Sequence, residues 1–298
     1  MSFFPIEYID PVFRPPSEAR SLILQVTNGC SWNKCTFCTM YTAEQKRFSP
    51  KPIDKIASEL HDMSVAGYEV RKIFLADGDA MTLSFRRLHE IMAVINQYFP
   101  NVERVSSYCL PRNLKNKSVD ELAKLQSMGL TLMYVGCETG DTELLQRVEK
   151  GETYESSLAA LQKIKQAGMA SSVMILNGLG GPEFSEQHAV QSARLMNEAQ
   201  PEYLSSLVIE LHQDGDRFVD KFDGRWRALT QLELFNEMHM LLDNLELENT
   251  VFRSDHASNY LVLKGQLGRD KALLLNTINT AINRPGVIPL RQEWQRGL

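Results

Sequence analysis

Short apolar runs alternate with amphipathic segments along most of the chain, and this alternation constrains the fold more than any other feature. Between the runs, hydrophobic residues recur at intervals of three and four, the period of a helix with one buried face. Strand–helix units of this size predict parallel strands joined by right-handed crossovers. The apolar runs of strand length lie at residues 22–27, 72–76, 104–108, 132–136, 172–177 and 203–211.

Three of the predicted helices end in the same way. Gly67, Gly129 and Gly168 each stand just after the last helical turn and shortly before an apolar run. Glycine adopts the left-handed conformation of a helix C-cap without a steric clash from a Cβ atom. Ser118 begins a further helix with Glu121 three residues on, which is the spacing of a capping box.

Six strand–helix units predict an α/β fold, most simply a partial (β/α)6 barrel of the TIM type. A doubly wound open sheet is the alternative, which periodicity does not exclude. In a barrel, ligands bind where the C-terminal ends of the strands meet the following loops. The pattern changes after about residue 212. We therefore expect the barrel with its N-terminal lead-in at residues 1–212, and a C-terminal helical extension packed on it at residues 213–298, with helices near 229–243 and 270–283.

Composition excludes several classes of partner. The chain of 298 residues has a formal net charge of −5 and no basic run, so it offers no field that would attract nucleic acid. Its longest apolar stretches are strand-sized, well short of the roughly 20 residues of a membrane helix. The first residues include acidic side chains and prolines, unlike a signal peptide. We expect a cytoplasmic protein that binds neither nucleic acid nor membrane.

Three of the five cysteines, Cys30, Cys35 and Cys38, lie within nine residues after the first predicted strand. An odd, clustered set without an export signal argues against disulfides and favours a metal. Thiolates suit zinc or iron–sulfur clusters. A closed zinc site needs four ligands, and the sequence has no second CxxC pair. A four-iron cluster held by three cysteines leaves one iron open to a small molecule. Zinc with a distant fourth ligand, or three unligated cysteines, are the alternatives.

With these cysteines the chain resembles the radical S-adenosylmethionine (SAM) superfamily. That family has three cysteines after the first barrel strand and an aromatic residue before the third, where this chain has Phe37. The spacing here is CxxxxCxxC, one residue longer than the usual CxxxCxxC. The resemblance covers about residues 20–210. The stretch Gly136-Cys-Glu138-Thr-Gly140, followed by LLQRVEKG, resembles the subgroup of oxygen-independent coproporphyrinogen oxidase and Elongator.

The resemblance implies a set of residues that contact SAM at successive strand ends. The segment Asp77-Gly78-Asp79 is similar to the glycine-rich motif that binds the methionine amino group, with Asp79 in the acidic position. Glu138 is expected near the ribose or the amino-acid part. Asn177 and Gly178 resemble the adenine-contacting motif, and Ser106 or Ser107 is expected to reach the ribose.

The resemblance also implies a reaction. A 4Fe–4S cluster on Cys30, Cys35 and Cys38 would reductively cleave SAM to a 5′-deoxyadenosyl radical, which abstracts hydrogen from a small-molecule substrate. Flavodoxin or ferredoxin would be the electron donor. The alternative is a non-catalytic iron–sulfur protein, either an electron carrier or a haem-chaperone-like protein.

Three residues are candidates for substrate chemistry. Cys109 follows the third strand, although a lone cysteine is more often a small buried hydrophobe, which is also the simpler interpretation of Cys137. Arg253 and His256 belong to the polar segment 253–260. A six-stranded barrel is open along one side, so we expect this segment to cover the cavity; a solvated surface loop is the alternative.

Overall fold

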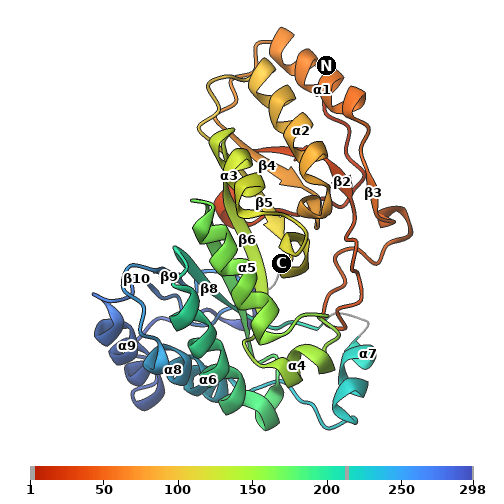
Figure 1. Ribbon diagram of the computed structural model, residues 1–298. Helices are drawn as coiled ribbons and strands as arrows, with labels where there is room; N and C mark the ends of the chain where they lie inside the picture. Colours follow the sequence, from red (N-terminus) through yellow and green to blue (C-terminus); the bar gives the residue numbers. More distant parts are fainter. Residues whose placement is uncertain (1–3, 212–214, 297–298) are drawn as a thin grey trace. The chain divides into compact units, whose positions relative to one another are not determined.

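The computed structural model describes residues 4–211 and 215–296 (Figure 1). The chain forms two compact units. The first comprises residues 1–33, 40–135 and 162–171, and the second comprises residues 34–39, 136–161 and 172–298. The loop with the three clustered cysteines thus belongs to both, because Cys30 lies in the first unit and Cys35 and Cys38 lie in the second.

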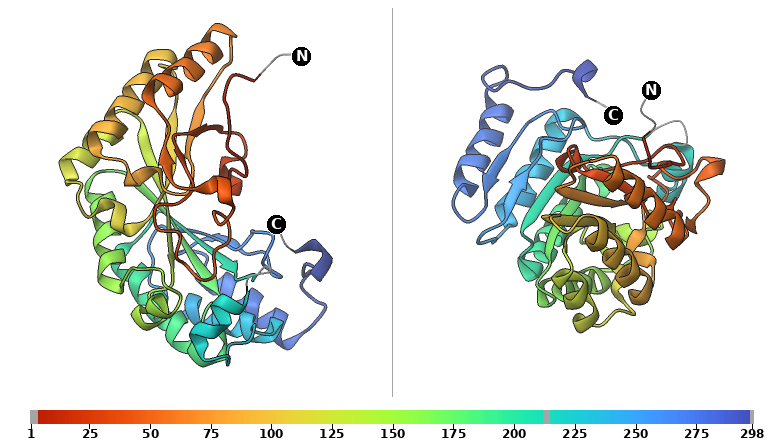
Figure 2. Two further views of the ribbon diagram at one scale, coloured as in Figure 1. Left: turned by 90° about the vertical axis from the view of Figure 1, so that its right-hand side faces the viewer. Right: turned by 90° about the horizontal axis from the view of Figure 1, so that it is seen from above.

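The first unit is built on parallel strands in the order β1, β4, β5 and β6. Their bounds are Leu22–Gln25, Lys72–Ala76, Arg104–Cys109 and Leu130–Glu138, and the last three residues of β6 belong to the second unit. The short strands β2 (Thr27–Asn28) and β3 (Ser49–Pro50) pair antiparallel at the two ends of the cysteine loop. Helices α1 (Ile53–Val65), α2 (Phe85–Tyr98) and α3 (Val119–Ser127) lie on one side of the parallel strands (Figures 1 and 2).

Local sequence explains these helices. Ile56, Leu60 and Met63 of α1 are buried on one face, as their spacing predicts. Ser118 and Glu121 form the predicted capping box at the start of α3. The three predicted C-cap glycines all have left-handed backbone, with φ of 76° at Gly67, 106° at Gly129 and 74° at Gly168.

The second unit contains strands β7 (Ala170–Asn177, from Ser172 onward), β8 (Tyr203–Val208) and β9 (Val251–Arg253), which pair in parallel, and β10 (Lys264–Gln266), which is antiparallel to β9. Helices α6 (Gly181–Ala199), α8 (Gln231–Asn244) and α9 (Lys271–Asn283) pack side by side in that order (Figure 1). Two shorter helices are α4 (Thr142–Arg147) and α7 (Gly215–Val219), and α5 (Tyr154–Gln166) begins in this unit and ends in the first. Single 3-10 turns occupy Pro16–Glu18, Glu44–Lys46, Ala80–Thr82, Pro111–Leu114, Asp220–Phe222 and Glu293–Gln295.

All six predicted strands are present, and the two helices predicted after residue 212 correspond to α8 and α9. Strand β8 ends at Val208 and not at residue 211. The sequence pattern did not indicate β9 and β10, because strands of three residues are too short to show an alternation. The expected boundary at residues 212 and 213 lies outside the described residues and stays a prediction.

An apolar cluster forms much of the core of the second unit. Its buried members are Leu144, Val148, Leu179, Phe184, Phe218 and Phe222, and Phe37 of the cysteine loop packs against it. Helices α4, α6 and α7 and the cysteine loop therefore share one core. None of the helices in the described parts of the chain has the length and apolarity to cross a membrane.

Candidate functional site

The clustered cysteines differ from the other two in exposure. Cys30, Cys35 and Cys38 lie partly exposed on a loop, whereas Cys109 and Cys137 are buried in strands. Burial raises the pKa of the Cys137 thiol to about 12, so it stays protonated at neutral pH. Three accessible thiols in one loop fit a thiolate-ligated metal group. No three Cys, His, Asp or Glu side chains of residues 4–211 and 215–296 already converge as a metal site, so the ligand set stays a prediction.

The part of the cysteine loop in the second unit is held at its backbone. The amide of Thr36 donates to the carbonyl of Val148 at 3.0 Å, at the end of α4. The amide of Cys38 donates to the carbonyl of Cys35 at 3.2 Å, which forms a tight turn. With Phe37 packed on the apolar core, the turn that carries Cys35 and Cys38 is attached to the end of α4.

Glu138 ends β6 and forms a buried ion pair that the sequence reasoning missed. Lys150 Nζ donates to Glu138 Oε1 at 2.7 Å, and the two side chains are 5% and 10% exposed. Glu138 has a φ of 65°, so its backbone turns away from the strand direction. A Cβ atom at Gly136 would lie 2.3 Å from Glu138 Oε1, so glycine at this position leaves room for the carboxylate where it is.

Lys150 also connects Glu138 electrostatically with the cysteine loop. Burial lowers the pKa of Lys150, but the negative charges of Glu138, Cys35 and Cys38 outweigh this effect and the pKa is raised. Its ammonium lies 5.8 Å from the centroid of the Phe37 ring. Lys150 is therefore a fixed cation near two predicted cluster ligands. The signal was in the sequence, since Lys150 ends the LLQRVEK stretch, but that stretch indicated only a subgroup.

Asp79, three residues after the end of β4 in the first unit, has the properties of a cation ligand. Its Oδ2 accepts hydrogen bonds from the amide of Ser31, at 3.3 Å, and from the Ser31 hydroxyl. Its Oδ1 is buried and has no hydrogen-bond partner among the described residues. Burial raises the pKa of Asp79, and the hydrogen bonds from Ser31 oppose this rise. An unsatisfied buried carboxylate oxygen fits the ammonium group for which the sequence proposed Asp79.

Asp77 and Gly78 have structural roles that the motif did not reveal. Asp77 forms an ion pair with Lys46, and both side chains are completely buried. Burial raises the pKa of Asp77, and the hydrogen bond from Lys46 opposes this effect. Gly78 is packed against the ring of Tyr41, where a Cβ atom would lie 2.3 Å from a ring carbon. Their predicted contacts with SAM stay predictions.

Ser107 and Cys109 lie on β5 and are buried. The Ser107 hydroxyl donates to the carbonyl of Leu75 at 3.2 Å, and the neighbouring Ser106 hydroxyl donates to that of Ile73 at 3.4 Å. The Cys109 thiol donates to the carbonyl of Leu110 at 3.4 Å. Both serines therefore connect β5 with β4, which is a structural role, and their predicted ribose contact stays a prediction.

Asn177 and Gly178 end β7 and are held by α8. The amide of Gly178 donates to Glu237 Oε1 at 2.6 Å, and Asn177 Nδ2 donates to the carbonyl of Leu234 at 3.2 Å. Gly178 has a φ of 86°. The C-terminal extension thus fixes the turn that the sequence assigned to adenine binding.

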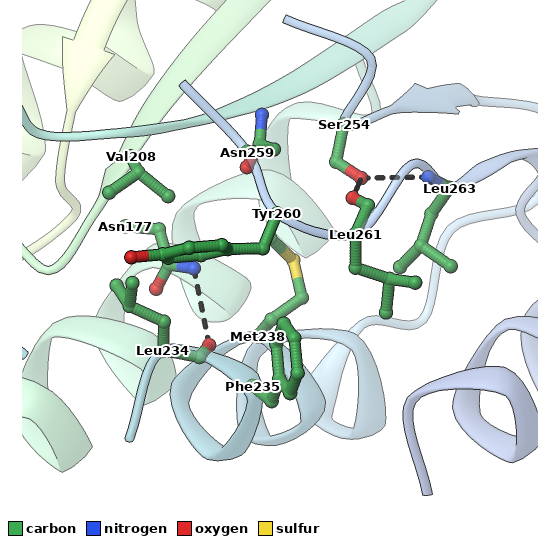
Figure 3. A pocket seen from close by; sticks show the side chains of 10 residues that line it. All are labelled: Asn177, Val208, Leu234, Phe235, Met238, Ser254, Asn259, Tyr260, Leu261 and Leu263. Carbon is green, nitrogen blue, oxygen red and sulfur yellow. Dashed lines mark hydrogen bonds between the residues drawn. The ribbon is translucent and has the colours of Figure 1, made fainter. Parts of the chain in front are cut away.

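Asn177 also lines a narrow pocket that is partly open to solvent (Figure 3). Helix α8 contributes Leu234, Phe235 and Met238 to its walls. Asn177 Oδ1 is buried without a partner among the residues described. The pocket is therefore mostly apolar with one unsatisfied acceptor.

The segment 253–260 contributes Ser254, Asn259 and Tyr260 to this pocket, whereas Arg253 and His256 have other contacts. The Arg253 guanidinium lies 5.6 Å from the centroid of the Tyr203 ring. His256 Nδ1 is 2.9 Å from the Ser258 hydroxyl, and its carbonyl accepts from Arg291 at 2.6 Å. Burial lowers the pKa of His256, although Glu210 opposes this. Their roles toward a substrate stay predictions.

Comparison with known proteins points to one family. The family model described as the radical SAM superfamily matches residues 24–196. Heme chaperone HemW of Buchnera aphidicola subsp. Schizaphis graminum is 21% identical over 194 residues, which are 64% of this chain and 51% of that protein. HemW of Bacillus subtilis is 22% identical over 144 residues, 48% of this chain and 38% of that protein. The chain thus spans about half, or less, of these curated relatives.

Solved structures agree on the fold. Coproporphyrinogen III oxidase HemN from Escherichia coli, described as a radical SAM enzyme, aligns with a TM-score of 0.54 and 16% identity over 75% of this chain and 52% of that one. The radical SAM methyltransferase TsrM from Kitasatospora setae, with cobalamin and a [4Fe-4S] cluster bound, aligns with a TM-score of 0.54 and 18% identity over 67% and 36% of the two chains. This likeness confirms the predicted α/β fold of the partial-barrel type.

Proposed function

Since the chain belongs to the radical SAM superfamily, we propose that it is an enzyme that cleaves SAM reductively and transfers the radical to a small-molecule substrate. The cofactors of this family, a 4Fe–4S cluster and SAM, are those that the sequence predicted. The observation that carries the proposal is the buried Glu138–Lys150 ion pair, because it brings a predicted SAM contact into the electrostatic neighbourhood of Cys35 and Cys38.

Cys30, Cys35 and Cys38 would hold the cluster. They fit this task because they are partly exposed thiols on one loop, in contrast to the buried Cys109 and Cys137. When bound, the cluster would supply one electron to the sulfonium of SAM, so that a C–S bond breaks and a 5′-deoxyadenosyl radical is released to abstract hydrogen. The cofactors would carry out electron transfer and bond cleavage, and the protein would orient SAM and the substrate and exclude water.

Two carboxylates would orient SAM. Asp79 offers its unsatisfied Oδ1 to the amino group, and an acceptor of this kind forms charge-assisted hydrogen bonds with an ammonium. Glu138 has one oxygen engaged by Lys150, which fixes the side chain in one orientation. Lys150 keeps its proton at neutral pH, since its pKa is raised.

The class of substrate is inferred from the charge of the chain, and the electron donor is inferred from the family. A low-molecular-weight substrate is supported by the absence of basic runs in the sequence, with a net charge of −5. Flavodoxin or ferredoxin is the donor that suits a low-potential cluster. Cys109, Arg253 and His256 are the candidates for contact with the substrate.

Anaerobic reconstitution followed by reduction with dithionite tests the function. We expect about four irons and four sulfides per chain, and 5′-deoxyadenosine formed from SAM. Replacing Cys30, Cys35 or Cys38 by alanine should abolish the cluster absorbance, whereas Cys137→Ala, a buried cysteine in the same unit as two of them, should retain it. A cluster that survives in the triple variant would refute the assignment.

A second candidate function is that of a haem chaperone, which is supported by the two HemW relatives. It would need the cluster but no turnover of SAM. Hemin titration monitored at the Soret band separates the two functions. Saturable haem binding without 5′-deoxyadenosine favours the chaperone, and 5′-deoxyadenosine without haem binding favours the enzyme.

A further inference from the structure

Arg217, from α7 in the C-terminal part of the chain, contacts the backbone of the cysteine loop. Its Nη2 lies 2.9 Å from the carbonyl oxygen of Cys35, 3.4 Å from that of Thr36 and 3.2 Å from that of Cys38. These three oxygens belong to the turn that presents two of the three predicted cluster ligands. A guanidinium has five N–H donors and no acceptor, so it is well suited to several carbonyls at once.

Helix α7 is anchored, although the Arg217 side chain is exposed. Phe218 and Phe222 are buried in the apolar cluster with Leu144 and Val148, and the ring of Trp226 packs on Phe218 with centroids 5.0 Å apart. Phe37 of the cysteine loop packs on the same cluster. The cysteine loop and α7 therefore pack on the same apolar cluster. The hydrogen bonds of Arg217 add a directional contact between the two segments.

We infer that Arg217 is a positioning residue for the iron–sulfur loop, which fixes the Cys35–Cys38 turn before a cluster binds and places a permanent positive charge beside it. The fixing of the turn is independent of the proposed function. The effect of the positive charge on a cluster rests on that function. A cluster with three thiolate ligands is anionic and gains a further negative charge on reduction. A fixed cation nearby stabilises the reduced form and raises the reduction potential, since net charge and hydrogen bonds set that potential.

The first half is tested without any cluster. Hydrogen exchange of peptides spanning residues 34–39 would be compared in the apo forms of wild type, Arg217→Gln, Arg217→Lys and Arg194→Gln. Arg194 is the matched control, an exposed arginine of the same unit that pairs with Glu198. Loss of a charged donor shared by three carbonyls should speed exchange roughly tenfold in Arg217→Gln and less in Arg217→Lys. Exchange in Arg217→Gln equal to wild type would overturn the positioning role.

The second half is tested on reconstituted protein by a redox titration followed by EPR. Arg217→Gln should have a more negative midpoint potential than wild type, and Arg217→Lys, which keeps the charge, should stay near wild type. The difference should shrink at high ionic strength, because the side chain is exposed. Equal potentials in all three proteins would overturn the electrostatic role. Wild type without any cluster would refute the proposed function, while the exchange result would still decide the positioning role.

Discussion

Lys150 Nζ and Glu138 Oε1 lie 2.7 Å apart across a helix and a turn, and neither side chain is more than 10% exposed. Removal of one partner from a buried pair leaves an uncompensated charge, which costs about 3–5 kcal/mol. We expect Glu138→Gln and Lys150→Met each to lower the free energy of unfolding of the apo protein by about that amount, as measured in urea.

The double variant Glu138→Gln/Lys150→Met distinguishes an ion pair from two independent contributions. With both charges gone, it should be more stable than at least one of the single variants, because no charge is left buried alone. Additive losses would mean that the two side chains do not depend on each other. Arg147→Gln serves as control, since Arg147 is paired with the exposed Glu143 on the same segment.

Asp79 gives a prediction about affinity. Asp79→Asn removes a charged acceptor whose Oδ1 has no partner among the described residues, so the fold should tolerate it. A charge-assisted hydrogen bond contributes roughly 1.5–3 kcal/mol, so SAM binding to reconstituted protein should weaken about 10- to 150-fold by calorimetry, with iron content unchanged. Asp62→Asn, an exposed carboxylate of α1, should bind SAM like wild type. Unchanged affinity in Asp79→Asn would place the amino-group contact elsewhere.

The sequence predicted the six strands and the helix caps because these depend on local periodicity and on glycine at positive φ, as at Gly67. It also predicted that Cys109 and Cys137 would be buried, because a lone cysteine in an apolar strand behaves as a small hydrophobe. It missed Lys150 and Arg217 for a physical reason. A long charged side chain acts at a distance from its own backbone, and only the packed structure shows that Arg217 meets carbonyls about 180 residues earlier in the chain. The Asp77–Lys46 pair was hidden for the same reason.

Arg253 and His256 lead to a prediction about turnover. If the segment 253–260 covers the substrate, alanine at either position should spare the cluster and SAM binding but change the rate of 5′-deoxyadenosine formation, roughly 10²- to 10⁴-fold if His256 acts as an acid or base. Asp255→Ala is the control, because Asp255 forms a surface pair with Lys264 in the same segment. Rates equal to those of the control in both variants would assign the segment a structural role.

Glu237 gives a prediction about pH that needs no cofactor. It is 2% exposed, and it accepts from the amide of Gly178 and from the Ser185 hydroxyl, each at 2.6 Å. Burial raises the pKa of Glu237 from its ordinary 4.5 to about 7. Between pH 4.5 and about 7, Glu237 therefore keeps its proton in the folded chain and loses it in the unfolded chain. The contribution of Glu237 to stability is full below pH 4.5 and is lost as the pH rises through about 7.

The neighbouring His188 titrates in the opposite sense. Its Nε2 lies 3.7 Å from Glu237 Oε1, its Nδ1 lies 2.8 Å from the Thr139 hydroxyl, and Asp141 is the nearby acid that opposes its shift. Burial lowers the pKa of His188 to about 4, so its contribution is present above pH 6.5 and is lost as the pH falls through 4. A pH profile of wild type alone would therefore mix two opposed effects, and a comparison with a variant is needed.

Glu237→Gln keeps the acceptor for Gly178 and removes the titration. Unfolding free energies of both proteins would be measured in urea at pH 5, 6, 7 and 8. As the pH rises, wild type should lose up to about 3 kcal/mol of unfolding free energy relative to Glu237→Gln. Glu233→Gln is the matched control on the same helix. Hydrogen bonds from Arg227 lower the pKa of this partly exposed carboxyl to about 2, so its difference from wild type should stay constant over this range. Parallel profiles for wild type and Glu237→Gln would mean that Glu237 is ionised throughout, and the turn at Gly178 would then be held by a charge.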